Sequence, residues 1–390
     1  MKEDMKTQLL TKSPKDLLFK LAIPGIIGMV VVGLYPFMDG IFAGWLIGDY
    51  AMSAISVSMS LTIINGGVSA LIGVGSASIL SRAIGKGDKE TTDKIFGNFC
   101  YWVIFFSVII TILGLVFAPH FLDLVGAKGN IKDLGVRYLR IVFFGSIFVN
   151  FAQAGNMTMR GEGALKQSML IMGIGAVLNI ILDPIFMKIM GEYAIEGAAI
   201  ATVLSQIVQA ILTFRYFSKK SAFVGIHKIQ KHNAIYNEMF SIGSSAMMMQ
   251  ILFAVQQTFL FKQAFAYGGD NWGILMSATM RLYMFSFIPL WGMSQGLQPV
   301  IGANFGAKQY QRVKDTMKIF MYGATILAAI SWIPSMFFSE KLLSLFNVRS
   351  EIIEAGVMNF KLFYSTFILY GIMIMTLTFF QSIEDGKKAS

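Results

Sequence analysis

The chain has 390 residues, of which 55% are hydrophobic and only 14% are charged. This composition excludes an ordinary soluble domain, in which about a quarter of the residues are charged. The net charge is +10, but the basic residues are scattered over short segments and form no single patch, so we expect no nucleic-acid partner. The chain has one cysteine, Cys100, and three histidines, His120, His227 and His232, so we expect neither a disulfide nor a metal cluster.

Apolar runs recur along the whole chain, and each is long enough to cross a hydrocarbon layer of about 30 Å as a helix. Their continuity argues against the strands of a membrane barrel, which alternate apolar and polar residues. We therefore predict an all-α polytopic membrane protein with about ten transmembrane helices. The predicted spans are 18–46, 53–80, 95–118, 135–158, 167–190, 194–217, 237–265, 272–300, 316–338 and 355–381.

Lys and Arg are distributed unevenly when these spans are threaded alternately through a membrane. About 22 fall on one side and about 10 on the other. The richer side carries the N-terminus, the 82–94 and 308–318 loops, the 219–231 segment and the C-terminus. Because cytoplasmic loops are enriched in basic residues, this side is predicted to be cytoplasmic. The first 17 residues are polar, and the apolar run after them is too long for a cleavable signal, so it is predicted to be the first membrane helix.

The two halves of the chain can be laid over one another at an offset of about 220 residues. In the first half, a helix that begins at 23–25 is followed by one that exits through 81–88. In the second half, a helix that opens at 242–244 is followed by one that exits through 302–308. Such repeats are common in secondary transporters, whose binding sites lie between the repeats near mid-membrane. We predict an N-lobe over 1–217 with helices 1–6, a cytoplasmic linker over 218–236, and a C-lobe over 237–390 with helices 7–10.

Two carboxylates, Asp39 and Asp183, lie well inside predicted spans, where a charge costs about 2.5–3.5 kcal/mol. Asn179 precedes Asp183 by one helical turn and shares its face. Pro184 cannot donate to the carbonyl one turn before it, which leaves another oxygen beside this pair. The group suits a proton or a small hard cation. The alternative is that either aspartate lies nearer an interface than predicted, or pairs with a basic residue such as Arg160.

Pro24 and Pro36 free carbonyl groups in the first helix in the same way, so this helix is predicted to bend near Asp39. A carboxylate kept from water holds a proton more tightly than one in water. Asp39 is therefore a candidate for loading and releasing a coupling proton beside a hinge. With Pro184 in the fifth helix, these two prolines are the predicted hinges.

The second half has no charge at the position that matches Asp39, which falls close to Gln256 and Gln257. Arg281 lies inside the eighth span and is expected to be a structural partner or a gate rather than a binder of cations. Methionines near these positions offer adaptable apolar surface, although most of them are expected to serve packing. The candidates for lining a substrate cavity are Tyr35, Gln256, Gln257, Arg281, Tyr283 and Met284.

Several short segments occur in an order typical of one transporter family. They are 39–44 (DGIFAG) with Pro24 before it, 160–163 (RGEG), 179–187 (NIILDPIFM), 196–202 (EGAAIAT), 295–299 (QGLQP) and 304–308 (NFGAK). Together they resemble the multidrug and toxic compound extrusion (MATE) family, in particular its bacterial DinF/MepA-like branch. The resemblance implies a bacterial cytoplasmic membrane protein that exports lipophilic cations by rocking two six-helix lobes. It also implies that Asp39, Asn179 and Asp183 carry the coupling ion, H⁺ or Na⁺, and that no other cofactor is needed.

The family has twelve helices, whereas the tenth predicted span is followed only by residues 382–390, so we expect the last two helices to be absent. This keeps a non-transporting remnant or assembly partner open as an alternative. A lipid-linked sugar flippase of the same superfamily is another, although it would be expected to need a basic cavity where the first lobe offers carboxylates. The sequence does not indicate an oligomeric state; the expected partners are lipophilic cations and the lipid bilayer.

Enzyme activity is not expected. The chain has no GxxxxGK[ST] phosphate loop, which argues against ATP hydrolysis. The segment 85–88 spells GKGD, like the motif of intramembrane aspartyl proteases, but that chemistry needs two facing carboxylates, and Asp88 belongs to a charged loop. The sequence therefore favours a secondary active multidrug efflux antiporter.

Overall fold

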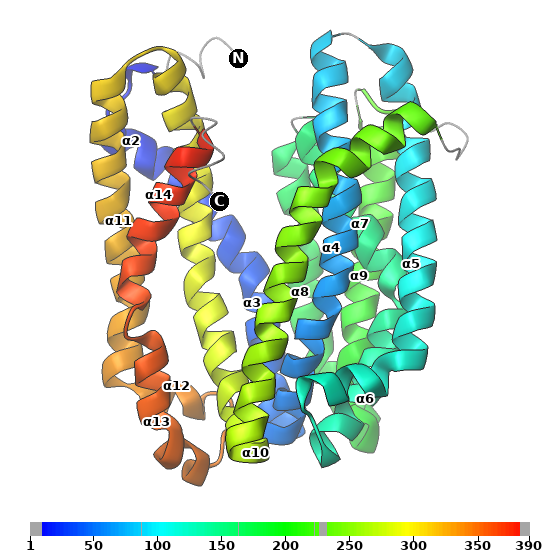
Figure 1. Ribbon diagram of the computed structural model, residues 1–390, viewed down its shortest axis with the longest axis vertical. Coiled ribbons are helices and arrows are strands. Elements are labelled where there is room, and N and C mark those ends of the chain that lie inside the picture. Colours follow the sequence, from blue (N-terminus) through cyan, green and yellow to red (C-terminus); the bar gives the residue numbers. More distant parts are fainter. Residues whose placement is uncertain (1–9, 87, 163, 222, 226–231, 383–390) are drawn as a thin grey trace. The chain divides into compact units, whose positions relative to one another are not determined.

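The computed structural model describes residues 10–86, 88–162, 164–221, 223–225 and 232–382. All regular elements within these ranges are helices (Figure 1). They are α2 (Pro14–Leu17), the π-helical η1 (Leu18–Ala22), α3 (Ile23–Leu46), α4 (Asp49–Lys86), α5 (Lys89–Val125), α6 (Gly129–Phe144), α7 (Ser146–Gly161), α8 (Leu165–Met190), the short η2 (Gly191–Tyr193), α9 (Ala194–Lys219), α10 (Asn233–Gly306), α11 (Tyr310–Phe337), α12 (Ser339–Ser344), α13 (Ser350–Tyr364), η3 (Phe367–Leu369) and α14 (Tyr370–Ser382). The predicted all-α class is confirmed.

Seven stretches of the described residues are long and apolar enough to cross a membrane, or eight if α6 and α7, which meet at 59°, form one broken span. The ten predicted spans overlap these eight stretches. Two of the stretches, Lys166–Lys219 and Asn233–Ser294, are 54 and 62 residues long, and each overlaps two predicted spans. The first breaks at Gly191 (φ +54°) and the second at Gly269, whose φ of +60° and ψ of −152° are not helical. The difference in number therefore lies at two glycines in left-handed conformations.

The helices begin earlier than the predicted spans where their first turns are polar. α5 starts at Lys89, because the Asp88 carboxylate accepts a hydrogen bond from the backbone N–H of Thr91 at 3.1 Å and so caps the helix. α11 likewise starts at Tyr310, before the predicted span at 316. Hydropathy marks the part of a helix that lies in lipid, not the residue at which the helix begins. The capping role also accounts for Asp88 in the GKGD segment.

Contacts divide the chain into two compact units. One extends over Met38–Ser277, and the other joins the chain up to Phe37 with the part from Ala278 onward. In the Met38–Ser277 unit, α4 packs against α5, α6 and α7, and α8 packs along α9. In the other unit, α11 packs against α14 and α13, and α12 packs against α13. This division follows packing rather than the sequence repeat, so the predicted lobes and their linker stay a prediction.

α4 and α7 approach each other closely where both carry small residues. A Cβ added at Gly73 would lie 2.8 Å from Cα and 2.9 Å from the carbonyl oxygen of Ala154, and one at Gly161 would lie 2.6 Å from Cα of Ala77. Burying apolar side chains between helices gains little in a bilayer, because lipid is apolar too. Close backbone approach through small residues therefore holds such helices together.

Buried hydrogen bonds join α4, α5 and α7 in the same unit. Ser69 Oγ donates to Asn150 Oδ1 at 3.1 Å, and Asn150 Nδ2 donates to Ser107 Oγ at 2.9 Å. All three side chains are fully buried. Hydrogen bonds between transmembrane helices contribute about 0.6 kcal/mol on average, so this chain of bonds adds to the close packing.

Replacing Gly73 by Ala is expected to lower the free energy of unfolding by about 1–3 kcal/mol, because the new methyl group meets backbone that cannot move aside. Gly67→Ala is the matched control on the same helix, since its Cβ would lie 3.6 Å from Met247 Cγ, an ordinary contact. The control should leave stability unchanged or raise it slightly, because Ala favours a helix more than Gly does. Thermal unfolding of both variants in detergent measures the difference, and equal midpoints would contradict this account of α4–α7 packing.

Candidate functional site

α8 and α9 bring together Asn179, Asp183 and Thr202. Asn179 Nδ2 donates to Asp183 Oδ1 at 3.1 Å and to Thr202 Oγ1 at 3.3 Å. The three residues are 2%, 0% and 3% exposed, so the group is shielded from solvent. The amide thus reaches one turn along its own helix and across to the neighbouring helix. Asn179 and Asp183 lie together as their spacing predicts, while their role in coupling stays a prediction.

The group offers several oxygen atoms to a cation or a proton. Asn179 Oδ1 is buried and accepts no hydrogen bond from the residues that the structure describes. Pro184 follows Asp183 inside α8 and has no N–H, so the carbonyl of Ile180 loses its usual helical donor. A carboxylate, an amide oxygen, a hydroxyl and a backbone carbonyl are ligands that hard cations prefer.

The local fold of α8 and α9 sets the register that joins Asn179 to Thr202. Gly191 makes the turn at the end of α8, and η2 leads directly into α9. Near the turn the two helices touch, because a Cβ added at Gly197 would lie 2.7 Å from the carbonyl oxygen of Phe186. Any larger residue at position 197 would push α9 away from α8 and lengthen the hydrogen bond to Thr202.

Sequence reasoning missed Thr202 as a member of this group. Threonine is common in helices, and its hydroxyl becomes an acceptor for Asn179 only through the register of the α8–α9 pair. One sequence feature could have indicated Thr202: it is the last residue of the 196–202 segment, which resembles a family motif.

Asp39 lies in α3, three residues after Pro36, and is only 1% exposed. Its position belongs to the Met38–Ser277 unit, so all three predicted coupling residues are in the same compact unit. The alternative partner Arg160 lies in the last turn of α7 and is exposed. Both aspartates are buried, and pairing with a basic residue such as Arg160 stays an alternative.

The predicted hinge at Pro36 has a specific partner. Arg281 is 7% exposed, and its Nη1 donates a hydrogen bond to the carbonyl oxygen of Pro36. Beside it, the ring of Phe37 stacks on Phe285 with a centroid distance of 4.5 Å. The role of Arg281 as a structural partner or a gate stays a prediction. Of the other hinge candidates, Pro184 lies inside α8, whereas Pro24 is the second residue of α3 and its side chain lies outside the described residues.

The six candidate cavity residues are not alike in their surroundings. Gln257 is 6% exposed, but its neighbour Gln256 faces outward. Tyr35 and Met284 are half-buried. Tyr283 packs in an aromatic cluster, with ring-centroid distances of 5.3, 5.6 and 5.7 Å to Phe363, Phe367 and Tyr370. This cluster gives Tyr283 a packing role that the sequence did not predict, and the lining of a cavity by these residues stays a prediction.

No group of three or more His, Cys, Asp and Glu side chains gathers as metal ligands in the part of the chain that the structure describes. Cys100 is buried in α5, and His120 lies near the end of the same helix. His232 precedes α10, and His227 lies outside the described residues.

These apolar helices define a multi-pass membrane protein that carries a buried polar group. The MatE family model matches residues 24–185 and 275–390, and the chain belongs to this family. Multidrug export protein MepA of Staphylococcus aureus (strain MSSA476) is 28% identical over 394 residues, which cover 99% of this chain and 86% of MepA.

Two solved structures are similar over nearly the whole chain. One is the inward-facing conformation of a multidrug resistance MATE family transporter of the MOP superfamily, with a TM-score of 0.87, 26% identity, and coverage of 97% of this chain and 86% of that one. The other is the MATE multidrug transporter DinF-BH in complex with a ligand, with a TM-score of 0.77, 30% identity, and coverage of 96% and 84%. The predicted family is confirmed.

A double-mutant cycle tests the contact between α8 and α9. Thr202→Val removes the acceptor and keeps the shape, while Asn179→Leu removes the donor, so the two changes should couple by about 0.6–1.7 kcal/mol in the free energy of unfolding. The control replaces Thr202→Val by Ser205→Ala, because the Ser205 hydroxyl donates to Ala201 in its own helix. Unfolding in detergent should show no coupling for the control pair, and the same coupling in both cycles would contradict the contact.

Proposed function

We propose that the protein is a secondary active multidrug efflux antiporter that exports lipophilic cationic compounds in exchange for H⁺ or Na⁺. The observation that carries this proposal is the buried group of Asn179, Asp183 and Thr202, in the same compact unit as the buried Asp39. Relatives support the substrate class, since MepA is a multidrug export protein and DinF-BH is a multidrug transporter that was solved with a ligand bound.

Electrostatics links the two carboxylates to an ion gradient. An ionised carboxylate in a low-dielectric interior is strongly disfavoured unless a counter-charge or hydrogen bonds compensate for the lost water. A proton removes the charge of Asp39 or Asp183, and a sodium ion balances it. Either ion therefore stabilises the site when it is closed to water, and leaves when the site opens to a compartment where that ion is dilute.

Alternating access requires helices that bend near the site. Pro36 interrupts the hydrogen bonding of α3 close to Asp39, and Pro184 does the same in α8 next to Asp183. Arg281 donates a hydrogen bond to the carbonyl oxygen of Pro36 itself, so it contacts α3 beside this predicted hinge. Similar solved structures include both inward-facing and outward-facing conformations of a MATE family transporter, with TM-scores of 0.87 and 0.73. A change in ion occupancy beside these prolines would shift the balance between two such conformations.

The proposed location is the bacterial cytoplasmic membrane, with the N-terminus in the cytoplasm. The excess of Lys and Arg on one set of segments carries this orientation. One contact supports it: Arg312 Nη2 donates to the carbonyl oxygen of Lys12 at 2.7 Å, so the N-terminal segment lies beside the basic start of α11. Both segments belong to the same face in the predicted threading.

Asp39→Asn and Asp183→Asn should each reduce ion-driven efflux at least about tenfold, because the amide cannot exchange a proton or balance a sodium ion. Asp133→Asn is the control, since Asp133 is exposed in α6. Efflux of an ethidium-like dye from proteoliposomes is measured under an imposed proton gradient and then a sodium gradient. Wild-type rates in both variants would remove the carboxylates from the mechanism. If neither gradient drives efflux by the wild type, the antiporter proposal falls.

A further inference from the structure

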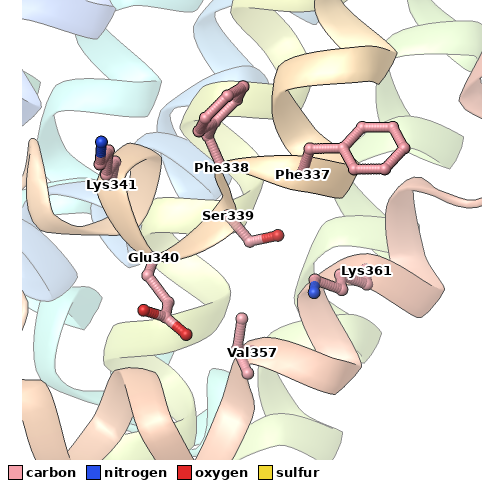
Figure 2. Close-up of a pocket in the computed structure, with 7 residues that line it drawn as sticks. All are labelled: Phe337, Phe338, Ser339, Glu340, Lys341, Val357 and Lys361. Atoms are coloured by element: carbon pink, nitrogen blue, oxygen red, sulfur yellow. The ribbon is translucent and has the colours of Figure 1, made fainter.

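A cavity of about 170 Å³ lies between the end of α11, the start of α12 and one face of α13. All of its walls belong to the same compact unit. The lining residues are Phe337, Phe338, Ser339, Glu340, Lys341, Val357 and Lys361 (Figure 2). None of them belongs to the coupling group or to the predicted substrate cavity, so the transport mechanism leaves this cavity without a role.

The cavity lies where two neighbouring helices meet the edge of the hydrocarbon layer. Residues 319–339 of α11 and the following turn are uncharged for 21 positions, a helix length of about 30 Å, and the run ends at Glu340. Residues 362–383 are uncharged for 22 positions, and this run begins after Lys361. The opposite end of α11 contacts the N-terminal segment through Arg312 and Lys12. The cavity therefore lies at the membrane face opposite the N-terminal segment.

Opposite charges face the cavity without neutralising each other. Figure 2 shows the Glu340 carboxylate and the Lys361 ammonium on opposite sides of Val357. Within the described part of the chain, neither group forms an ion pair. Lys341 also lines the cavity, but its Nζ lies over the ring of Phe338, 5.7 Å from the centroid, and is directed away from Glu340 and Lys361 (Figure 2). One carboxylate and one ammonium thus remain for a ligand that carries both charges in the complementary order.

The rim of the cavity is apolar and exposed. Phe337, Met358 and Leu362 are each 72% exposed, and all three lie at the lipid side of the charge boundary or next to it. Exposed apolar residues at this depth contact acyl chains rather than water. A ligand that fits the site therefore has a charged headgroup and apolar tails.

We propose that this cavity binds the headgroup of a zwitterionic phospholipid with a primary amine, of the phosphatidylethanolamine type. Lys361 contacts the phosphate, Glu340 accepts hydrogen bonds from the ammonium group, and the acyl chains lie along Phe337, Met358 and Leu362. An anionic lipid such as phosphatidylglycerol is disfavoured, because Glu340 repels a headgroup that has no cation to offer. Phosphatidylcholine keeps the charge but loses the N–H donors, so it binds more weakly.

The test measures lipid retention by the purified full chain in detergent, using native mass spectrometry with phosphatidylethanolamine, phosphatidylcholine and phosphatidylglycerol added in turn. Wild type should retain phosphatidylethanolamine about tenfold better than phosphatidylglycerol. Glu340→Gln and Lys361→Gln should each remove most of this preference, since each loses one charge-assisted hydrogen bond. The matched controls are Lys314→Gln, an exposed base in α11 outside the cavity, and Glu351→Gln, an exposed acid in the first turn of α13.

The controls should retain the wild-type preference. Equal retention of the three lipids by wild type, or an equal loss in the controls, overturns the proposal.

Soluble glycerophosphoethanolamine, added as competitor, distinguishes a site for a phospholipid from a site for a free soluble headgroup. A lipid site requires acyl chains, so the soluble headgroup should compete only at about a hundredfold higher concentration or more. Competition at the same concentration as the lipid would show a site for a soluble zwitterion and overturn the assignment to a phospholipid. The measurement does not involve transport, so its outcome is independent of the antiporter proposal.

Discussion

Hydrocarbon offers no hydrogen bonds, and this one constraint decides both the helices of this protein and the group at its proposed ion site. Backbone N–H and C=O groups form hydrogen bonds with one another within each helix, so the chain can cross lipid wherever about 20 apolar residues follow one another. Side chains have no such internal partner. Asn179 therefore donates to Asp183 in its own helix and to Thr202 in the next one, and the polar group that serves the site also ties α8 to α9.

Much of the fold could be predicted from the sequence, because a run of about 20 apolar residues is long enough to cross the hydrocarbon layer as a helix. The breaks at Gly191 and Gly269, which adopt positive φ, lie in the gaps between predicted spans, at 190–194 and 265–272. The bend inside the predicted span 135–158 was harder to predict. The bend of 59° between α6 and α7 has no proline at its centre and lies at Gly145, where a Cβ would come within 2.7 Å of Val203. Such bends depend on a neighbouring helix that a sequence window does not contain.

The residues of the candidate site also differ in whether the sequence alone could predict them. Asp39 and Asp183 stand out in the sequence because a charge inside an apolar run is costly, and that cost does not depend on which helices surround it. Thr202 carries no such cost, since a hydroxyl can bond within its own helix, and only the register of α8 and α9 gives it a partner across the pair. Gln256 and Gln257 show most clearly that burial cannot be predicted from residue type alone. They are adjacent and chemically identical, yet packing leaves one exposed and buries the other.

Depth in the membrane also explains why similar charges favour different ligands at the two proposed sites. A carboxylate such as Asp183 has lost its water, so a bare ion that neutralises it stabilises the site, and the binding of that ion depends on which compartment the site faces. Glu340 and Lys361 keep part of their hydration at the boundary, where a small ion competes poorly with water and a ligand gains chiefly by matching both charges and covering apolar rim. The two sites belong to different compact units, so a bound phospholipid would act on the packing of α11–α13 without touching the ligands of the coupling ion. Lipid composition is then expected to change the stability of one unit rather than the choice between proton and sodium.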